Sequence, residues 1–183
     1  MLRRVCIFCG ANFGNLPQYR DAARAMGAAL VEHDLELVFG GGKIGLMGVL
    51  ADAVLEGGGR ATGVIPRALE ERELAHCGLS ELIVVASMHE RKATMERLSD
   101  AFIALPGGIG TFEEILEILT WAQLEIHPKP VGLLNVEGYY DKLIALLDQA
   151  VDADFMPASS REGLHVESDP ASLLALCQGH SPE

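Results

Sequence analysis

The sequence predicts an α/β fold, in which a doubly wound parallel sheet is covered by helices on both faces. Short apolar runs alternate with segments of helical periodicity along the whole chain. The apolar runs are continuous and lack the polar alternation of a sheet with one face in water, which is typical of parallel strands. No linker, repeat or low-complexity segment interrupts this pattern, so we expect a single domain over residues 1–183.

Seven apolar runs bounded by turn residues are predicted to be the strands. They cover residues 4–9, 35–39, 61–65, 82–86, 101–105, 131–134 and 164–166. In such folds, ligands bind beyond the carboxyl ends of the strands. Three segments that begin at these ends are rich in glycine, and they cover residues 10–14, 40–45 and 106–110.

Seven further segments are predicted to be helices, mostly from apolar residues spaced three and four apart. The first has Pro17 in its first turn, the second ends at the glycines 57–59, and Pro128 ends the fifth. In order, the helices cover residues 17–33, 46–56, part of 67–78, 87–98, a segment from the glycine loop to about 125, 139–151 and 170–177.

Composition and charge limit the possible partners. The chain has 26 acidic and 14 basic residues, a net charge of −12. This excess argues against nucleic acid and against an anionic membrane, although a local cluster can still hold a small anion. Residues 1–4 are followed by only five apolar residues before Gly10, which does not fit a signal peptide, and no apolar run is long enough to span a membrane. We therefore expect a cytoplasmic protein.

Cys6 and Cys9 form a Cys-x-x-Cys pattern, which can indicate a metal or redox pair. Three residues apart on a strand, however, they point to opposite faces of the sheet. We interpret them as core thiols and expect no metal site.

Residues 105–114, Leu-Pro-Gly-Gly-Ile-Gly-Thr-Phe-Glu-Glu, join a predicted strand to a predicted helix. A glycine-rich turn at the start of a helix exposes backbone N–H groups and the helix dipole to an anion, most often phosphate. Thr111 and Glu114 also fit a capping box, which is an alternative role for Glu114. Three glycines favour a ligand, because a cap requires none of them.

Gly40, Gly42 and Gly45 have the spacing of a dinucleotide-binding fingerprint. They follow the second strand rather than the first, no acidic residue ends the next strand, and Ile44 replaces the Ser or Thr of a P-loop. This loop is therefore either a wall of a nucleotide site or a point of tight packing.

Met88, Arg91, Met95 and Leu98 share one helix face, and the three apolar members predict that this face is packed. A buried arginine requires an anionic partner, so Arg91 and its neighbour Lys92 are candidates to bind phosphate, carboxylate or a developing charge. The alternative is that Arg91 reaches solvent at the edge of the stripe. Ser87 and Glu90 predict a capping box at the start of this helix.

Two motifs together resemble the signature of the LOG family of cytokinin riboside 5′-monophosphate phosphoribohydrolases. They are Pro106-Gly107-Gly108-x-Gly110-Thr111-x-x-Glu114 and Met88-His89-Glu90-Arg91-Lys92. The resemblance extends over nearly the whole chain and departs at Ala11-Asn12, where many members carry serine.

The resemblance implies a Rossmann-like fold, a homodimer with sites near its interface, and no cofactor. It implies that Arg91 and Glu114 are catalytic. It also implies substrate contacts from Glu73, Met88, Arg91, Lys92, Gly107, Gly108, Ile109, Gly110, Thr111, Phe112, Glu113, Glu114 and Thr120.

The predicted reaction is hydrolysis of the N-glycosidic bond of an adenosine 5′-monophosphate, with or without a modified N6, to free base and ribose 5-phosphate. A non-catalytic nucleotide-binding or carrier protein is the main alternative. An NAD oxidoreductase is a weaker one. A pyridoxal-phosphate decarboxylase is disfavoured because Lys43, Lys92, Lys129 and Lys142 all lack a recognisable Schiff-base context.

Overall fold

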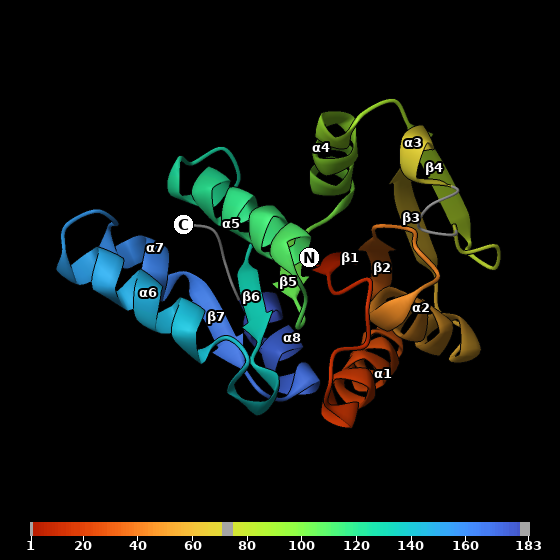
Figure 1. Cartoon of the computed structure of the whole chain (residues 1–183), viewed down its shortest axis with the longest axis horizontal. Coiled ribbons are helices and arrows are strands. Elements are labelled where there is room, and N and C mark those ends of the chain that lie inside the picture. The colour runs from red at the N-terminus through yellow and green to blue at the C-terminus, as the bar shows by residue number, and fades with distance from the viewer. Residues whose placement is uncertain (1, 71–74, 180–183) are drawn as a thin grey trace.

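The computed structural model describes residues 2–70 and 75–179 and contains the predicted α/β fold (Figure 1). Seven strands form one sheet in the order β4-β3-β2-β1-β5-β6-β7, and all neighbouring strands are parallel. Each predicted strand is confirmed to within one residue at either end. The strands are β1 Arg4–Phe8, β2 Glu36–Phe39, β3 Ala61–Pro66, β4 Glu81–Val85, β5 Ala101–Ala104, β6 Val131–Leu134 and β7 Leu164–Glu167.

The seven predicted helices are also present. Two short elements were not predicted, α7 and the 3-10 turn η1, because neither is long enough to show a helical period. The helical elements are α1 Pro17–Glu32, α2 Gly45–Glu56, α3 Arg67–Glu70, α4 Met88–Leu98, α5 Ile109–Gln123, η1 Val136–Gly138, α6 Asp141–Asp152, α7 Ala158–Glu162 and α8 Pro170–Gly179.

The helices cover both faces of the sheet (Figure 1). Side chains of α1, α2 and α8 pack with one face in a first apolar cluster, and side chains of α4, α5 and α6 pack with the other face in a second. Cys9 belongs to the first cluster and Cys6 to the second, which confirms that they point to opposite faces. Within the described ranges, no helix combines the length and hydrophobicity needed to cross a lipid bilayer.

The strand order places a crevice between β1 and β5. The chain adds β2, β3 and β4 on one side of β1 and then crosses over to place β5 on the other side. The loops that follow β1 and β5 therefore lead away in opposite directions, and ligands bind at such switch points. The two strand ends stay joined, because Leu105 N donates to Phe8 O at 2.9 Å and Gly10 N donates to Pro106 O at 3.1 Å.

Candidate active site

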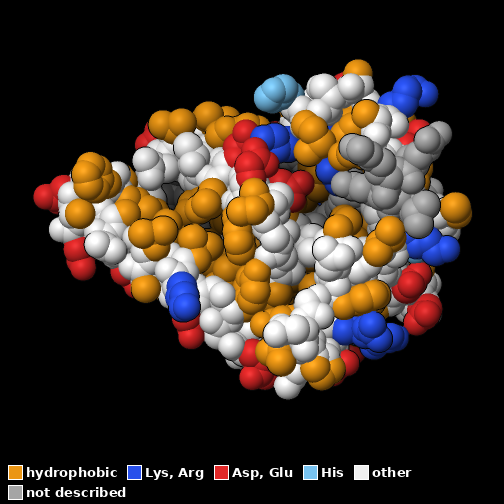
Figure 2. Space-filling model, in the orientation of Figure 1, with side chains coloured by type: hydrophobic (Ala, Val, Ile, Leu, Met, Phe, Trp, Pro, Cys, Tyr) orange, Lys and Arg blue, Asp and Glu red, His pale blue; other side chains and the backbone are white. Residues whose placement is uncertain are grey.

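A cavity of about 510 Å³ lies at this switch point. Its wall comes from residues 9–14 after β1, Tyr19 of α1, the start of α2, Leu69, one face of α4, residues 106–114 and Tyr139. In the view of Figure 2, acidic and basic side chains gather beside a hollow near the centre of the molecule. The cavity is thus built from segments that are far apart in the sequence.

The first turn of α5 is open toward this cavity. The helix begins at Ile109, and its N-cap residue Gly108 provides no side-chain cap. Among the described residues, no acceptor faces the N–H groups of Gly108, Ile109, Gly110 or Thr111. A Cβ atom added to Gly108 or Gly110 would meet no atom of the described residues within 4 Å. Free amides, a helix N-terminus and empty space beside them are the features of an anion site.

The capping box proposed for Thr111 and Glu114 is wrong. Thr111 is the third residue of α5 and therefore cannot be its N-cap. The glycines allow the helix to begin two residues before the threonine, which leaves Glu114 in the second turn. By contrast, Ser87 is confirmed as the N-cap of α4, because its Oγ accepts from Glu90 N at 3.1 Å. The Glu90 carboxylate accepts from Ala86 N at 2.7 Å, one residue before the N–H group that a capping box would use.

Glu114 lies on the cavity wall, one turn after Gly110. Burial, and after it the negative charge of Glu114, raises the pKa of the Cys9 thiol. Cys9, the residue after β1, lines the same cavity, so Glu114 lies on the cavity at the switch point.

Arg91 is 5% exposed and also lines the cavity. Its Nε donates to Val64 O at 3.0 Å and its Nη2 donates to Gly40 O at 2.9 Å, while Nη1 lies 3.8 Å from the sulfur of Met88. These contacts attach the guanidinium to β3 and to the residue that follows β2, beside the cavity. The prediction that Arg91 lies on the packed face of its helix is confirmed, and the solvent-exposed alternative is wrong.

The loop between β2 and α2 serves packing. A Cβ atom on Gly40 would lie 2.1 Å from Arg91 Nη2, and one on Gly45 would lie 2.3 Å from the carbonyl carbon of Ala11. Gly45 also has a φ of +67°, which favours glycine. The cavity wall includes Leu46 and Met47 but none of residues 40–45. This loop was expected to be either a wall of a nucleotide site or a point of tight packing, and the described residues show the tight packing.

Lys92 is not part of the cavity wall and joins α4 to α5. Its Nζ bonds to Glu113 and lies 3.0 Å from Glu117 Oε1. Partial burial alone would lower the pKa of Lys92, but the hydrogen bonds and charges of Glu113 and Glu117 raise it overall. Lys92 therefore stays protonated and ties the two helices that carry Arg91 and Glu114.

The structure brings most of the predicted substrate-contacting residues to the cavity wall: Met88, Arg91, Gly107, Gly108, Gly110, Thr111, Glu113 and Glu114. It places four others elsewhere. Lys92 pairs with the glutamates, Ile109 is 82% exposed, Phe112 packs against Tyr139 and Tyr140, and the Thr120 hydroxyl bonds to Leu116 O. Glu73 lies outside the described residues.

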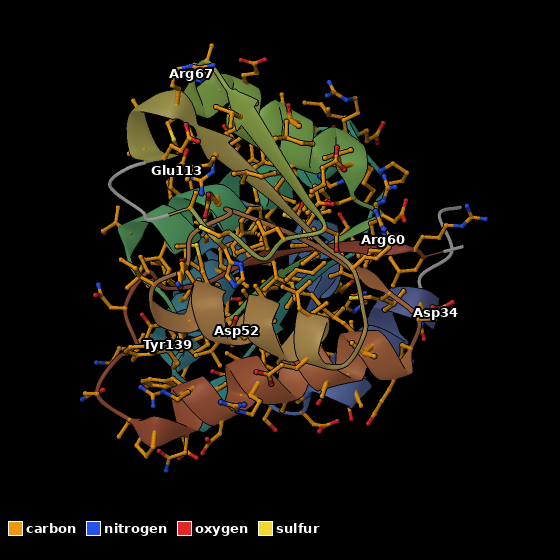
Figure 3. The ribbon with its side chains drawn as sticks, turned by 90° about the vertical axis from the view of Figure 1, so that its right-hand side faces the viewer. Asp34, Asp52, Arg60, Arg67, Glu113 and Tyr139 are labelled. Carbon is orange, nitrogen blue, oxygen red and sulfur yellow. The ribbon has the colours of Figure 1, made fainter. Side chains whose placement is uncertain are left out.

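Sequence reasoning did not identify the two tyrosines of the wall, Tyr19 and Tyr139. Their rings pack edge to face with centroids 5.6 Å apart. Figure 3 shows Tyr139 and Glu113 on the same side of the molecule. Tyr139 follows β6, which the sheet places beside β5. No local signal marks this residue, because its role depends on the strand order.

Within residues 2–70 and 75–179, no three His, Cys, Asp or Glu side chains form a group that could hold a metal ion. All four cysteines carry free thiols.

Residues 47–177 match a family profile described as "Possible lysine decarboxylase". The chain is 49% identical over 181 residues to cytokinin riboside 5′-monophosphate phosphoribohydrolase LOG2 of Arabidopsis thaliana, covering 99% of this chain and 85% of that protein. It is 53% identical over 180 residues to LOG3 of the same plant, which carries the same enzyme name, covering 98% and 84%.

A solved structure has the same fold at low sequence identity. It is the molybdenum cofactor carrier protein of Chlamydomonas reinhardtii, with a TM-score of 0.72 and 20% identity, covering 98% of each chain. At this identity the likeness concerns the fold alone.

Proposed function

The chain belongs to the LOG family of phosphoribohydrolases, and we propose that it hydrolyses the N-glycosidic bond of adenosine 5′-monophosphates, with or without an N6 substituent. The products are the free base and ribose 5-phosphate. The observation that carries this proposal is the cavity at the switch point, which joins the open N-terminus of α5 to Glu114 and Arg91. The names of the relatives support the same reaction.

In this proposal, the first turn of α5 binds the 5′-phosphate. The N–H groups of Gly108, Ile109 and Gly110 have no acceptor among the described residues, and the helix dipole adds a favourable field. Hydrogen bonds from amides to an anion are stronger than those between neutral groups. The open space at Gly108 and Gly110 lets the phosphate approach the backbone.

Glu114 acts at the glycosidic bond. Cleavage of such a bond passes through a state in which positive charge develops on the sugar. A carboxylate on the cavity wall stabilises that charge and orients or activates the attacking water. Its place one turn after the phosphate-binding amides fits a ribose that lies between the two groups.

Arg91 supplies positive charge for the departing base or for the phosphate. An arginine side chain stays protonated in proteins, so it assists electrostatically and does not act as a simple general acid. The carbonyl groups of Gly40 and Val64 fix the direction of the guanidinium before the substrate binds.

The substrate contacts that we propose are the predicted residues on the cavity wall. Contacts from Lys92, Ile109, Phe112, Thr120 and Glu73 stay predictions. The lining of the cavity also argues against a Schiff-base decarboxylase. All four lysines lie in the described part of the chain, and none of them lines the cavity.

Release of free base from AMP and from N6-isopentenyl-AMP tests the reaction. Glu114→Gln keeps the size of the side chain and removes its charge, and we expect kcat to fall by about 10²-fold or more. Glu117→Gln is the matched control on the same helix. It removes a carboxylate that lies outside the cavity wall, and Lys92 keeps its bond to Glu113.

A folded Glu114→Gln variant with wild-type activity would show that Glu114 is not catalytic. A wild-type protein that binds AMP and releases no base would identify the carrier alternative instead. Circular dichroism of each variant establishes that any loss of activity is not a loss of fold.

We also propose a homodimer, as the family resemblance implies. Hydrophobic side chains gather over α5 and α6 at the left of Figure 2. Leu146 of α6 is 60% exposed and Phe155 after it is 88% exposed, although Leu143 and Leu147 of the same helix pack partly on the core. Exposed apolar patches of this kind mark interaction sites.

Light scattering coupled to gel filtration measures the assembly. A mass of about twice the 19.6 kDa of the chain is the expected result, and Leu146→Asp is expected to shift it toward the monomer. A monomeric wild-type protein would contradict the dimer.

The free thiols fit a reducing compartment and support the cytoplasmic location, which microscopy of a tagged chain would test.

A further inference from the structure

Two adjacent tyrosines just before α6, Tyr139 and Tyr140, hold the loop between β5 and α5. The hydroxyl of Tyr140 donates to Leu105 O at 2.6 Å, and the hydroxyl of Tyr139 donates to Gly107 O. The carbonyl between these two, that of Pro106, accepts from the amide of Gly10 at 3.1 Å. Three consecutive carbonyl groups of the loop therefore have fixed directions.

Fixing a carbonyl also fixes the amide that follows it. In a trans peptide, the C=O group and the next N–H group share a plane and point in opposite directions, and the described residues contain no cis bond. The Tyr139 hydroxyl thus sets the direction of the Gly108 N–H. Gly108 lines the cavity, and its N–H has no acceptor among the described residues.

The second tyrosine has a different effect. The residue after Leu105 is Pro106, which has no N–H. The bond from Tyr140 to the Leu105 carbonyl therefore stabilises the loop without aiming an amide. Tyr140 is 1% exposed and does not line the cavity.

The rest of the fold keeps both rings in place without their hydroxyl groups. The side chain of Asn135 accepts from Tyr140 N at 2.7 Å and donates to Asp141 at 2.7 Å, which fixes the turn before α6. The Tyr139 ring packs edge to face on Tyr19 and Tyr140, with centroids 5.6 and 5.1 Å apart. Replacing either tyrosine by phenylalanine should therefore remove one hydrogen bond and little else.

We propose that Tyr139 is a positioning residue that aims the Gly108 amide at the anionic group of the substrate. That this group is a 5′-phosphate rests on the proposed function. Tyr139 acts through the peptide group and not on the reacting atoms. The pair of tyrosines thus separates two tasks, aiming an amide and stabilising the loop.

The test compares Tyr139→Phe with Tyr140→Phe. Steady-state release of base gives kcat and KM for AMP, and calorimetric titration with ribose 5-phosphate gives a Kd that does not depend on catalysis. For Tyr139→Phe, we expect KM and Kd to rise about tenfold, the effect of one misdirected hydrogen bond to a charged group. We expect kcat to stay within about twofold, because the phosphate is bound equally in the ground state and the transition state.

Tyr140→Phe is expected to behave in the opposite way. It leaves the buried Leu105 carbonyl without its donor, so the melting temperature falls, whereas KM and Kd stay at the wild-type values. An unchanged Kd in Tyr139→Phe, or an equal loss of affinity in both variants, would overturn the inference.

The two readouts also separate this inference from the proposed function. If the wild type binds ribose 5-phosphate and releases no base, and Tyr139→Phe still weakens binding, the inference stands and the hydrolase proposal fails. If the wild type binds no ribose 5-phosphate, the inference is overturned along with the phosphate site.

Discussion

Two glycine-rich loops flank β1, one after β2 and one after β5, and the structure uses them in opposite ways. In the loop after β2, Cβ atoms on Gly40 and Gly45 would lie 2.1 and 2.3 Å from other parts of the protein. In the loop after β5, Cβ atoms on Gly108 and Gly110 would have no neighbour within 4 Å in the part of the chain that the structure describes. At Gly40 and Gly45, the missing side chains make room for the protein itself, as they do at Gly107, where a Cβ atom would lie 2.1 Å from Thr111 Oγ1. At Gly108 and Gly110, they leave room for a ligand.

This difference shows why glycine spacing alone does not identify a nucleotide site. The loop after β2 has the dinucleotide spacing, yet its glycines admit the guanidinium of Arg91 and the backbone of Ala11. The loop after β5 lacks that spacing but starts a helix at the switch point. What distinguishes the loops is their place in the sheet and the atoms next to each Cα. Glycine-to-alanine substitutions therefore test the comparison directly.

The largest effect is expected for Gly45→Ala in the packed loop. The alanine must adopt a φ of +67°, and its Cβ meets the Ala11 backbone, which cannot move as a side chain could. The strain and the clash together should lower the free energy of unfolding by about 3 kcal/mol or more. Chemical denaturation measures this loss.

Gly58→Ala is the matched control for that loss. Gly58 has a φ of +81°, and no described residue lies within 4 Å of a Cβ there, so only the backbone strain of about 1–2 kcal/mol remains. Equal losses in the two variants would mean that the contact with Ala11 contributes nothing, and the contrast between the loops would lose its physical basis.

The second-largest effect is expected for Gly110→Ala in the open loop, and it is a loss of activity. Alanine favours a helix over glycine by about 1 kcal/mol, so stability should stay the same or rise. The added methyl group occupies space that we assign to the phosphate, so kcat/KM should fall about tenfold or more. Thermal melting and base release from AMP provide the two measurements.

A glycine in open space far from the cavity controls for the substitution itself. Gly179, the last residue of α8, also has no neighbour within 4 Å of a Cβ among residues 2–70 and 75–179, and Gly179→Ala should keep full activity. If Gly110→Ala were as active as the wild type, the open loop would not bind the phosphate, and the cavity would need another anion site.

The fold could be predicted well from the sequence because each strand and helix is marked by residues within the element or next to it. The periods of the strands and helices, and the glycines and prolines that end them, placed every strand to within one residue. The buried position of Arg91 was also local, since three apolar residues share its helix face. Tyr139 and the orientation of Lys92 depend instead on contacts between elements, namely β6 beside β5 and α4 beside α5. Neither contact leaves a pattern in the surrounding residues.

The smallest effect is expected for Lys43→Ala, which tests whether the packed loop after β2 contacts the substrate. In a phosphate-binding P-loop, the lysine after the last glycine contacts the nucleotide and its loss is severe. Here Lys43 is exposed, and the cavity wall does not include it. We therefore expect a change in unfolding free energy within about 0.5 kcal/mol and a kcat/KM within about twofold of the wild type. Lys142→Ala, at an exposed position on α6, sets the background for removing one positive charge from this acidic protein. A tenfold fall in kcat/KM for Lys43→Ala alone would mean that the loop after β2 also contacts the substrate, so its glycines would serve both packing and binding.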